Sequence, residues 1–231
     1  MRRRLVMAAL AGLAFAGPAF ARCEGWVPQP KPQNAGRDVV GKDLDEIVER
    51  GWIEFAAYED FPPWSWEEGG KAKGVDIEIG RLIAEALSVE PRFRLVAAGE
   101  NLDADLRNYV WKGAVVGGRV SNVMLHVPYD SEYACRVEQV VFTGQYADEQ
   151  IAIAYREDAY PEDPPVPAYF RIDTVAVEND SISDFYLTSF AGGQTAQGVR
   201  RYPSHAAAME ALAAGETMAA MGPLAQLEAG A

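Results

Sequence analysis

Three aromatic side chains lie close together in Phe61-Pro62-Pro63-Trp64-Ser65-Trp66 and are the first candidates for ligand binding. Phe61, Trp64 and Trp66 could stack on a flat or apolar ligand, or present an apolar face to a protein partner. At least one of them is expected to pack into the interior instead. Alternation along the chain predicts that Trp64 and Trp66 share one face and that Phe61 lies opposite.

Charged and hydroxyl side chains elsewhere could hold the polar part of a ligand. Arg136 can bind a carboxylate, or can pair with one of the many acidic side chains. Ser181 and Ser183 precede a predicted helix, where they and the nearby N–H groups could receive an anion, although capping of the helix explains both serines equally well. His126 follows an apolar run and is either a ligand contact or a hydrogen-bonded structural histidine.

Signs of catalysis are lacking. The sequence holds no Gly-x-Ser-x-Gly elbow, no phosphate-binding loop, no haem-attachment motif and no histidine–carboxylate spacing typical of a metal site. Glu59 or Asp60 could serve as an acid in a cleft, which keeps an enzyme as a third alternative. We therefore expect a protein that is not an enzyme and that has no cofactor and no bound metal.

The elements around the aromatic stretch predict an α/β protein. A helix from Leu44 to Gly51, a strand over 52–57, a helix from about Asp76 to Leu87 with Asp76 as its N-cap, a strand over 91–96, a helix over 102–111 and a strand over 122–127 follow one another. This order predicts a mainly parallel sheet flanked by helices.

A second α/β lobe is predicted after residue 145. Strands are expected over 150–155, 174–177 and 217–221, and helices over 183–189 and 205–213. The predicted domains are therefore a signal peptide at 1–21, an extended arm at 22–43, a first lobe at 44–145 and a second lobe at 146–231. Two such lobes predict a ligand cleft between them.

The N-terminus is typical of export. Arg2-Arg3-Arg4 precede an apolar run that ends in Ala19-Phe20-Ala21, and the run is too short for a membrane span. We expect a periplasmic protein, without a membrane span in the mature chain. Removal of residues 1–21, with three arginines and no acid, changes the formal net charge from −13 to −16. Such a charge disfavours nucleic acid as a partner.

Cys23 and Cys135 could form one disulfide in that compartment, or could both be unpaired.

These motifs, taken in order, resemble those of type II periplasmic solute-binding proteins of the amino-acid type, solute-binding family 3. Phe61 to Ser65 is similar to the family's aromatic Pro-Pro loop, and Gly74-Val75-Asp76-Ile77-Glu78-Ile79 to the start of its first-lobe helix. Arg136-Val137-Glu138-Gln139-Val140, then Phe142 to Tyr146, resemble the run into its hinge. Tyr202-Pro203-Ser204, followed by residues 207–215, resembles its second-lobe signature. The resemblance implies the two-lobed type II periplasmic binding protein fold and a small organic ligand delivered to an ABC transporter permease.

Two segments depart from that family. The resemblance implies a Gly-x-Thr segment and an arginine for the ligand carboxylate, and a second-lobe aspartate for its ammonium group. Arg136 matches the arginine, but the chain has His126-Val127-Pro128 at the first place and Met221-Gly222-Pro223, without an acid, at the last. A buried zwitterion would lack its counter-charge. A free α-amino acid bound in the family's usual way is therefore not expected.

The same departures resemble a subgroup. Residues 123–128 and Gly222-Pro223-Leu224-Ala225 are similar to segments of the MxaJ and XoxJ type of protein, which accompanies pyrroloquinoline-quinone methanol dehydrogenases. This resemblance implies the alternative function, an accessory role with a periplasmic quinoprotein dehydrogenase or its cytochrome as partner. Members of the family also continue past the position of Ala231 with a strand that returns to the first lobe. We therefore expect a second lobe that is incomplete relative to the family.

Overall fold

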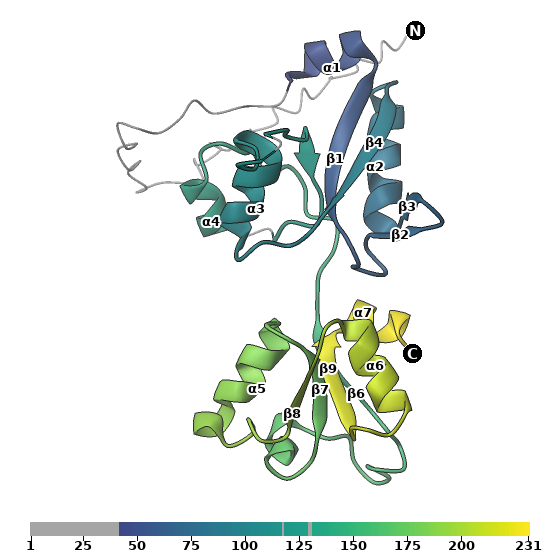
Figure 1. The fold of residues 1–231 in the computed structure, drawn as a ribbon, viewed down its shortest axis with the longest axis vertical. Coiled ribbons are helices and arrows are strands. Elements are labelled where there is room, and N and C mark those ends of the chain that lie inside the picture. The colour runs from purple at the N-terminus through teal and green to yellow at the C-terminus, as the bar shows by residue number, and fades with distance from the viewer. Residues whose placement is uncertain (1–41, 117, 129–130) are drawn as a thin grey trace, which may run out of the picture.

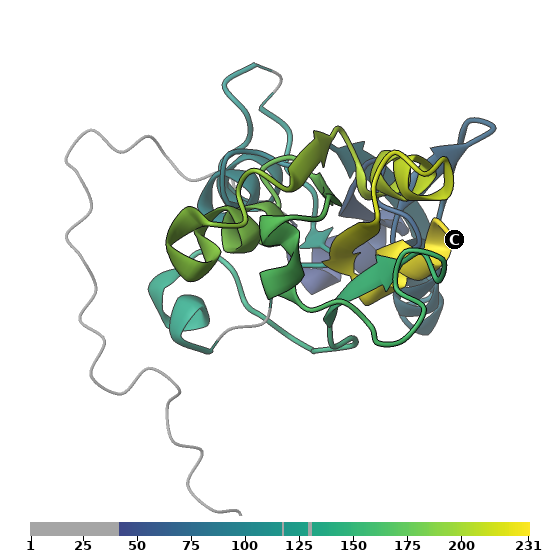
Figure 2. The same ribbon diagram turned by 90° about the horizontal axis from the view of Figure 1, so that it is seen from below.

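The computed structural model describes residues 42–116, 118–128 and 131–231. The predicted signal peptide and nearly all of the predicted arm lie outside the described residues, so both stay predictions. The described elements form two groups, here called the first lobe (the elements within residues 44–136) and the second lobe (the elements within residues 151–229). Figure 1 shows the two lobes stacked along the long axis of the molecule and joined by one segment of chain; seen from below, one lobe lies in front of the other (Figure 2).

The first lobe contains a three-stranded parallel sheet in the order β4-β1-β5. Its strands are β1 (Trp52–Tyr58), β4 (Glu90–Val96) and β5 (Val123–Met124), and β2 (Trp66–Glu68) pairs with β3 (Lys71–Lys73) as a separate hairpin. Its helices are α1 (Leu44–Arg50), α2 (Val75–Ala86), α3 (Leu102–Leu106), the π-helix η1 (Arg107–Trp111) and α4 (Ser131–Arg136). Helix α2 covers one face of the sheet, where Phe55 and Ala84 are fully buried together with Leu125.

The second lobe contains a four-stranded sheet in the order β6-β9-β7-β8, parallel except for β6. Its strands are β6 (Ile151–Tyr155), β7 (Val175–Glu178), β8 (Val199–Tyr202) and β9 (Ala219–Pro223). Its helices are the 3₁₀-helix η2 (Pro167–Arg171), α5 (Ile182–Gly193), α6 (His205–Ala213) and α7 (Leu224–Ala229). Phe170, Val175 and Leu187 fill the core on one face of this sheet, and Ala208, Leu212 and Leu227 on the other.

Sequence signals explain where several elements begin and end. The side chains of Asp43, Ser181 and Ser204 each accept a hydrogen bond from a first-turn N–H of α1, α5 and α6. Gly51 ends α1 in the left-handed conformation that favours glycine. The predicted α/β fold with mainly parallel sheets is confirmed, and helix α6 has the predicted bounds.

Three local predictions are wrong, and one strand was not predicted. The strand expected over 122–127 has only two residues, because the backbone turns at His126, whose φ is +57°. Strand β8 was not predicted, because its pattern Val-Arg-Arg-Tyr has little apolar content. The last strand is β9, displaced toward the C-terminus from the predicted 217–221. Asp76 is not an N-cap: Gly74 holds that position, and Asp76 lies in the first turn with a fully buried side chain.

Both lobes direct the carboxyl ends of their parallel strands toward each other. Figure 1 shows β1 descending toward the second lobe and β9 rising toward the first. Ligands of open α/β sheets bind outside the carboxyl ends of the strands. This arrangement therefore places residues 59–65 and 126–128 on the side of the first lobe that faces the second lobe.

Candidate functional site

An aromatic cluster stands at the carboxyl edge of the first-lobe sheet. It consists of Phe61, Trp64, His126 and Tyr146, and is called the aromatic cluster below. The ring centroid of His126 lies 4.5 Å from that of Trp64 and 4.9 Å from that of Phe61, with Tyr146 at 6.3 Å. These residues follow β1, β5 and the segment that leads to the second lobe, so the fold joins three distant parts of the sequence here.

The loop that carries Phe61 and Trp64 is a tight turn. The N–H groups of Trp64 and Ser65 donate to the carbonyl oxygen of Phe61, at 2.8 and 2.9 Å. Because the chain reverses direction, the alternation expected of a strand does not apply. Phe61 and Trp64 therefore both contact His126, whereas Trp66 is in β2 opposite Lys73. The prediction that Trp64 and Trp66 share a face, with Phe61 opposite, is wrong.

Gly74 brings α2 directly against this turn. Its φ of +120° is in the range that favours glycine, and a Cβ at this position would lie 2.1 Å from the carbonyl oxygen of Trp64. That oxygen accepts a hydrogen bond from the N–H of Asp76 at 3.0 Å. The close approach positions the Asp76 carboxylate beside the aromatic cluster.

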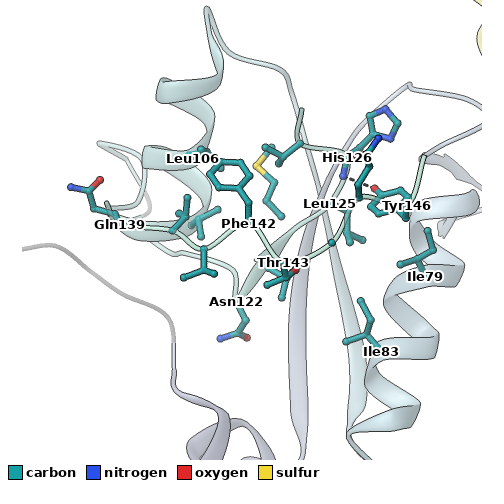
Figure 3. A pocket seen from close by; sticks show the side chains of 18 of the residues that line it. Ile79, Ile83, Leu106, Asn122, Leu125, His126, Gln139, Phe142, Thr143 and Tyr146 are labelled. Carbon is teal, nitrogen blue, oxygen red and sulfur yellow. Dashed lines mark hydrogen bonds between the residues drawn. The ribbon is translucent and has the colours of Figure 1, made fainter. Parts of the chain in front are cut away.

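Asp76 is the buried polar centre of the site. Its side chain is 0% exposed. The hydroxyl of Tyr146 donates to Asp76 Oδ1 at 2.8 Å and accepts the N–H of His126 at 2.6 Å, the bond dashed in Figure 3. Burial and the neighbouring Asp76 carboxylate raise the pKa of Tyr146, so this hydroxyl stays protonated and can donate.

Three polar atoms at this place are buried and have no hydrogen-bond partner among the described residues: Trp64 Nε1, Asp76 Oδ2 and His126 Nδ1. His126 Nδ1 lies 3.5 Å from Asp76 Oδ1, which is within the distance of an ion pair, but the two atoms do not form a hydrogen bond. Buried polar atoms without partners are costly in a folded protein. A ligand that offers hydrogen-bonding groups here would satisfy them.

A cavity of about 590 Å³ adjoins the cluster on the side of β5 (Figure 3). His126 and Tyr146 stand at one end of it, and the remainder of its lining is mainly aliphatic, including Ile79, Ile83 and Leu106. This volume is large enough for a small organic molecule.

The second lobe has its own cavity, of about 560 Å³, at the start of α5. Ile151, Ile153, Met221 and Tyr186 line it, together with Ser183. The side chain of Ser183 is buried, and its Oγ has no hydrogen-bond partner in the part of the chain that the structure describes. Ser181 is the helix N-cap and accepts the N–H of Asp184 at 3.2 Å. Of the two serines, Ser183 is therefore the one left to contact a ligand.

Two acidic groups that the sequence analysis missed complete the second-lobe edge. Glu178 ends β7 and accepts the N–H of His205 at 3.1 Å, with His205 Nε2 at 3.2 Å from the same Oε2. Burial raises the pKa of Glu178 and lowers the pKa of His205 to about 4. Nearby, Asp184 binds Arg201 through both carboxylate oxygens at 2.8 Å.

Gly222 allows the arrangement around His205. A Cβ on Gly222 would lie 2.7 Å from His205 Nδ1, so only glycine leaves room for the imidazole. Residues 221–223 carry no acid, but β7 lies beside β9 in the sheet and ends in Glu178. Glu178 could have been identified only from the pairing of β7 with β9, and that pairing cannot be derived from a single sequence.

Arg136 and Cys135 lie on α4. The guanidinium of Arg136 lies 5.5 Å from the ring centroid of Tyr133, and its side chain is not part of the aromatic cluster. Cys135 is disulfide-bonded. Cys23 lies outside the described residues, so the pairing of these two cysteines stays a prediction.

Comparisons with known proteins identify the fold. No protein-family model and no curated protein matches the chain. Solved structures do match. An ancestral cationic amino acid solute-binding protein, AncCDT-1, is 20% identical with a TM-score of 0.61, over 78% of this chain and 72% of the other. This chain has the type II solute-binding fold.

Three further matches support that statement. The arginine-bound form of a truncated ArgBP from T. maritima is 22% identical, with a TM-score of 0.53, over 80% of this chain and 79% of the other. A solute receptor for L-cysteine of Neisseria gonorrhoeae is 21% identical, with a TM-score of 0.54, over 80% and 69%. A second AncCDT-1 structure, described as a precursor of cyclohexadienyl dehydratase, has a TM-score of 0.58 at 20% identity. No helix in the described ranges has the length and apolarity of a membrane crossing.

Proposed function

We propose that this protein is a periplasmic receptor that binds a small organic solute between its two lobes and presents it to an ABC transporter permease. The observation that carries the proposal is a group of three buried atoms, Trp64 Nε1, Asp76 Oδ2 and His126 Nδ1, which have no hydrogen-bond partner among the described residues. Trp64 and His126 follow the carboxyl ends of β1 and β5, and Asp76 lies in the first turn of α2. Most of the similar structures are described as binding proteins or solute receptors, which supports the same class of function.

The charges of the site favour a ligand with a cationic or hydrogen-bond-donating group. Asp76 supplies a buried acceptor on the first lobe, and Glu178 supplies a carboxylate on the second. Arg136 stands over Tyr133, so it does not add a positive charge to the aromatic cluster. Phe61 and Trp64 suit an apolar or aromatic portion of the same ligand.

Ligand screening by thermal unfolding tests the proposal. Amines, cationic and aromatic amino acids, carboxylates and sugars would each be added to the mature protein. A ligand present at 100 times its Kd stabilises the folded state by about 2.7 kcal/mol. For a chain of this size, we expect an increase in Tm of roughly 5–10 °C. A screen in which no compound raises Tm would contradict the proposal.

Two tryptophan variants locate the site. Trp64→Ala removes a ring of the aromatic cluster, whereas Trp66→Ala removes a ring from β2. By isothermal titration calorimetry, we expect Trp64→Ala to raise Kd at least tenfold and Trp66→Ala to change it less than threefold. Equal effects of the two substitutions would place the ligand elsewhere.

The accessory role beside a quinoprotein dehydrogenase rests on two short motifs, and the similar structures give it no further support. Pull-down from periplasm distinguishes the two functions, because recovery of a dehydrogenase or cytochrome without permease components would replace our proposal. We propose no catalytic activity, since Glu59 and Asp60 are both exposed. Turnover that disappears with Glu59→Gln or Asp60→Asn would contradict this.

A further inference from the structure

The cavity of the second lobe is formed by that lobe alone. It lies between the edge strand β6, the start of α5 and the segment that enters η2. Ile153 and Met221 line its inner side and pack against the core that also contains Phe170. All of its lining residues lie within 151–221, so the cavity is complete without the first lobe. A molecule can therefore bind here without closure of the two lobes.

The lining of this apolar space includes one buried hydroxyl group. Ser183 is 1% exposed, and its Oγ has no hydrogen-bond partner in the described part of the chain. Capping of α5 does not explain this serine, because the N-cap is Ser181. A buried polar group without a partner costs free energy. Since a hydroxyl can donate and accept, one hydroxyl or carbonyl group of a bound molecule would satisfy Ser183.

The other lining side chains suit a neutral aromatic ring. Tyr186 offers a ring for edge or stacking contacts, and the sulfur of Met221 can contact the edge of an aromatic ring. Pro165 and Pro167 add apolar surface on the side of η2. No charged side chain lines the cavity among the described residues. A charged ligand would therefore lose its hydration without gaining a counter-charge.

The cavity has the size and the access that such a molecule needs. Its volume of about 560 Å³ exceeds that of an apolar cavity of about 150 Å³, which is already large enough for benzene. Ile182 and Tyr186, on the side of α5, are 71% and 43% exposed. These two side chains therefore border an opening to solvent, through which a ligand can enter.

We propose that this cavity is a second binding site, for a neutral aromatic molecule that carries one hydroxyl or carbonyl group, such as a simple phenol. The ring lies among the apolar side chains, and Ser183 binds the oxygen. This site goes beyond the proposed solute site and does not depend on it, because neither Asp76 nor Glu178 lines the cavity. The second lobe can thus hold a neutral molecule whether or not a cationic solute is bound.

NMR of the mature protein with labelled Ile and Met methyl groups tests the proposal, with p-cresol as the probe. We expect p-cresol to shift the methyl resonances of Ile151, Ile153 and Met221, with a Kd of about 1 mM or lower. Ile79 and Ile83 line the cavity of the first lobe and report on binding there. Shifts confined to these two residues, or no shifts at about ten times that concentration, would overturn the proposal.

The variant Ser183→Ala tests the role of the hydroxyl. We expect it to raise the Kd of p-cresol about three- to tenfold, as the loss of one hydrogen bond does, and to change the Kd of toluene less than about twofold. The control is Ser189→Ala on the same helix, because Ser189 Oγ binds the carbonyl oxygen of Phe185 at 2.8 Å and does not line the cavity. Equal effects of Ser183→Ala on p-cresol and toluene, or none on p-cresol, would overturn the proposal.

Charged analogues test the selectivity for neutral molecules. Benzylamine and benzoate have a similar ring but carry a charge at neutral pH, and we expect neither to shift the methyl resonances of Ile153 and Met221. Shifts as large as those with p-cresol would overturn the selectivity. The two proposals can fail separately: a solute screen without any bound amine would not change the result for p-cresol, because the NMR signals come from the second lobe alone.

Discussion

Replacing Tyr146 by phenylalanine removes one hydroxyl and breaks two hydrogen bonds. Asp76 Oδ1 loses the donor at 2.8 Å, and the N–H of His126 loses the acceptor at 2.6 Å. A hydrogen bond to a charged group contributes about 1.5–3 kcal/mol, and a buried group left without a partner costs about 1–3 kcal/mol. Because the two bonds share one hydroxyl and their effects overlap, we expect Tyr146→Phe to lower the free energy of unfolding by about 3 kcal/mol.

Urea unfolding of the mature protein, followed by circular dichroism, measures this change, which also corresponds to a decrease in Tm of about 6–12 °C. The matched control is Tyr155→Phe, because the hydroxyl of Tyr155 has no hydrogen-bond partner within the described ranges and its side chain is 38% exposed. We expect the control to change the free energy of unfolding by less than about 0.5 kcal/mol.

A double-mutant cycle with Asp76→Asn separates the Tyr146–Asp76 bond from other effects. If the hydroxyl and the carboxylate stabilise each other, the two substitutions together cost less than the sum of each alone, by at least about 1 kcal/mol. Additive effects, or a Tyr146→Phe effect no larger than that of Tyr155→Phe, would refute the reasoning about the buried network.

Three further predictions concern backbone space and pH. We expect Gly74→Ala to lower the free energy of unfolding by more than about 3 kcal/mol, because the added Cβ would meet the backbone of Trp64. The control Gly69→Ala, where φ is +60° and no atom lies within 4 Å, should lower it by only about 1 kcal/mol. Thermal unfolding compares the two variants. Gly222→Ala should displace the imidazole of His205 and shift its ring resonances in the NMR spectrum; unchanged resonances would contradict the close approach. The pKa of His205 is about 4 in the folded chain and about 6.5 when unfolded, so the unfolded state binds the proton first, and stability should decrease by up to about 3 kcal/mol as the pH falls from 6.5 to 4. His205→Gln should flatten this part of the pH profile, and an unchanged slope would assign it to other groups.

Much of the fold could be predicted from one sequence, because local patterns determine it. Helix α6 and strands β1 and β4 lie where apolar periodicity placed them, and Ser181 caps its helix as its position indicated. These features depend on residues within one turn or one strand. The position of β8 could not be predicted, because two arginines interrupt its apolar pattern.

The candidate site was predicted only in part, because it forms from contacts between distant residues. Phe61, Trp64 and His126 were chosen by type, but their contact depends on a turn that brings residues 61 and 64 to the same side. Asp76 was interpreted as a helix cap because a cap needs only local sequence. Its actual partner, Tyr146, is 70 positions away.

The carboxylate of Glu178 on the second lobe is likewise a feature that depends on contacts between distant residues and not on local sequence. The absence of an acid at residues 221–223 argued against a site for a cationic group, since the sequence was compared with the family at one strand end only. In the sheet, β7 and β9 are neighbours and parallel, so their carboxyl ends lie on one edge. Glu178 therefore places a carboxylate at the edge where β9 ends. His205 contacts this carboxylate, and its imidazole fits there because Gly222 has no side chain. The edge can therefore keep a negative charge although β9 carries no acid. We expect Glu178→Gln to lower the affinity for a cationic ligand more than the affinity for a neutral ligand of the same shape.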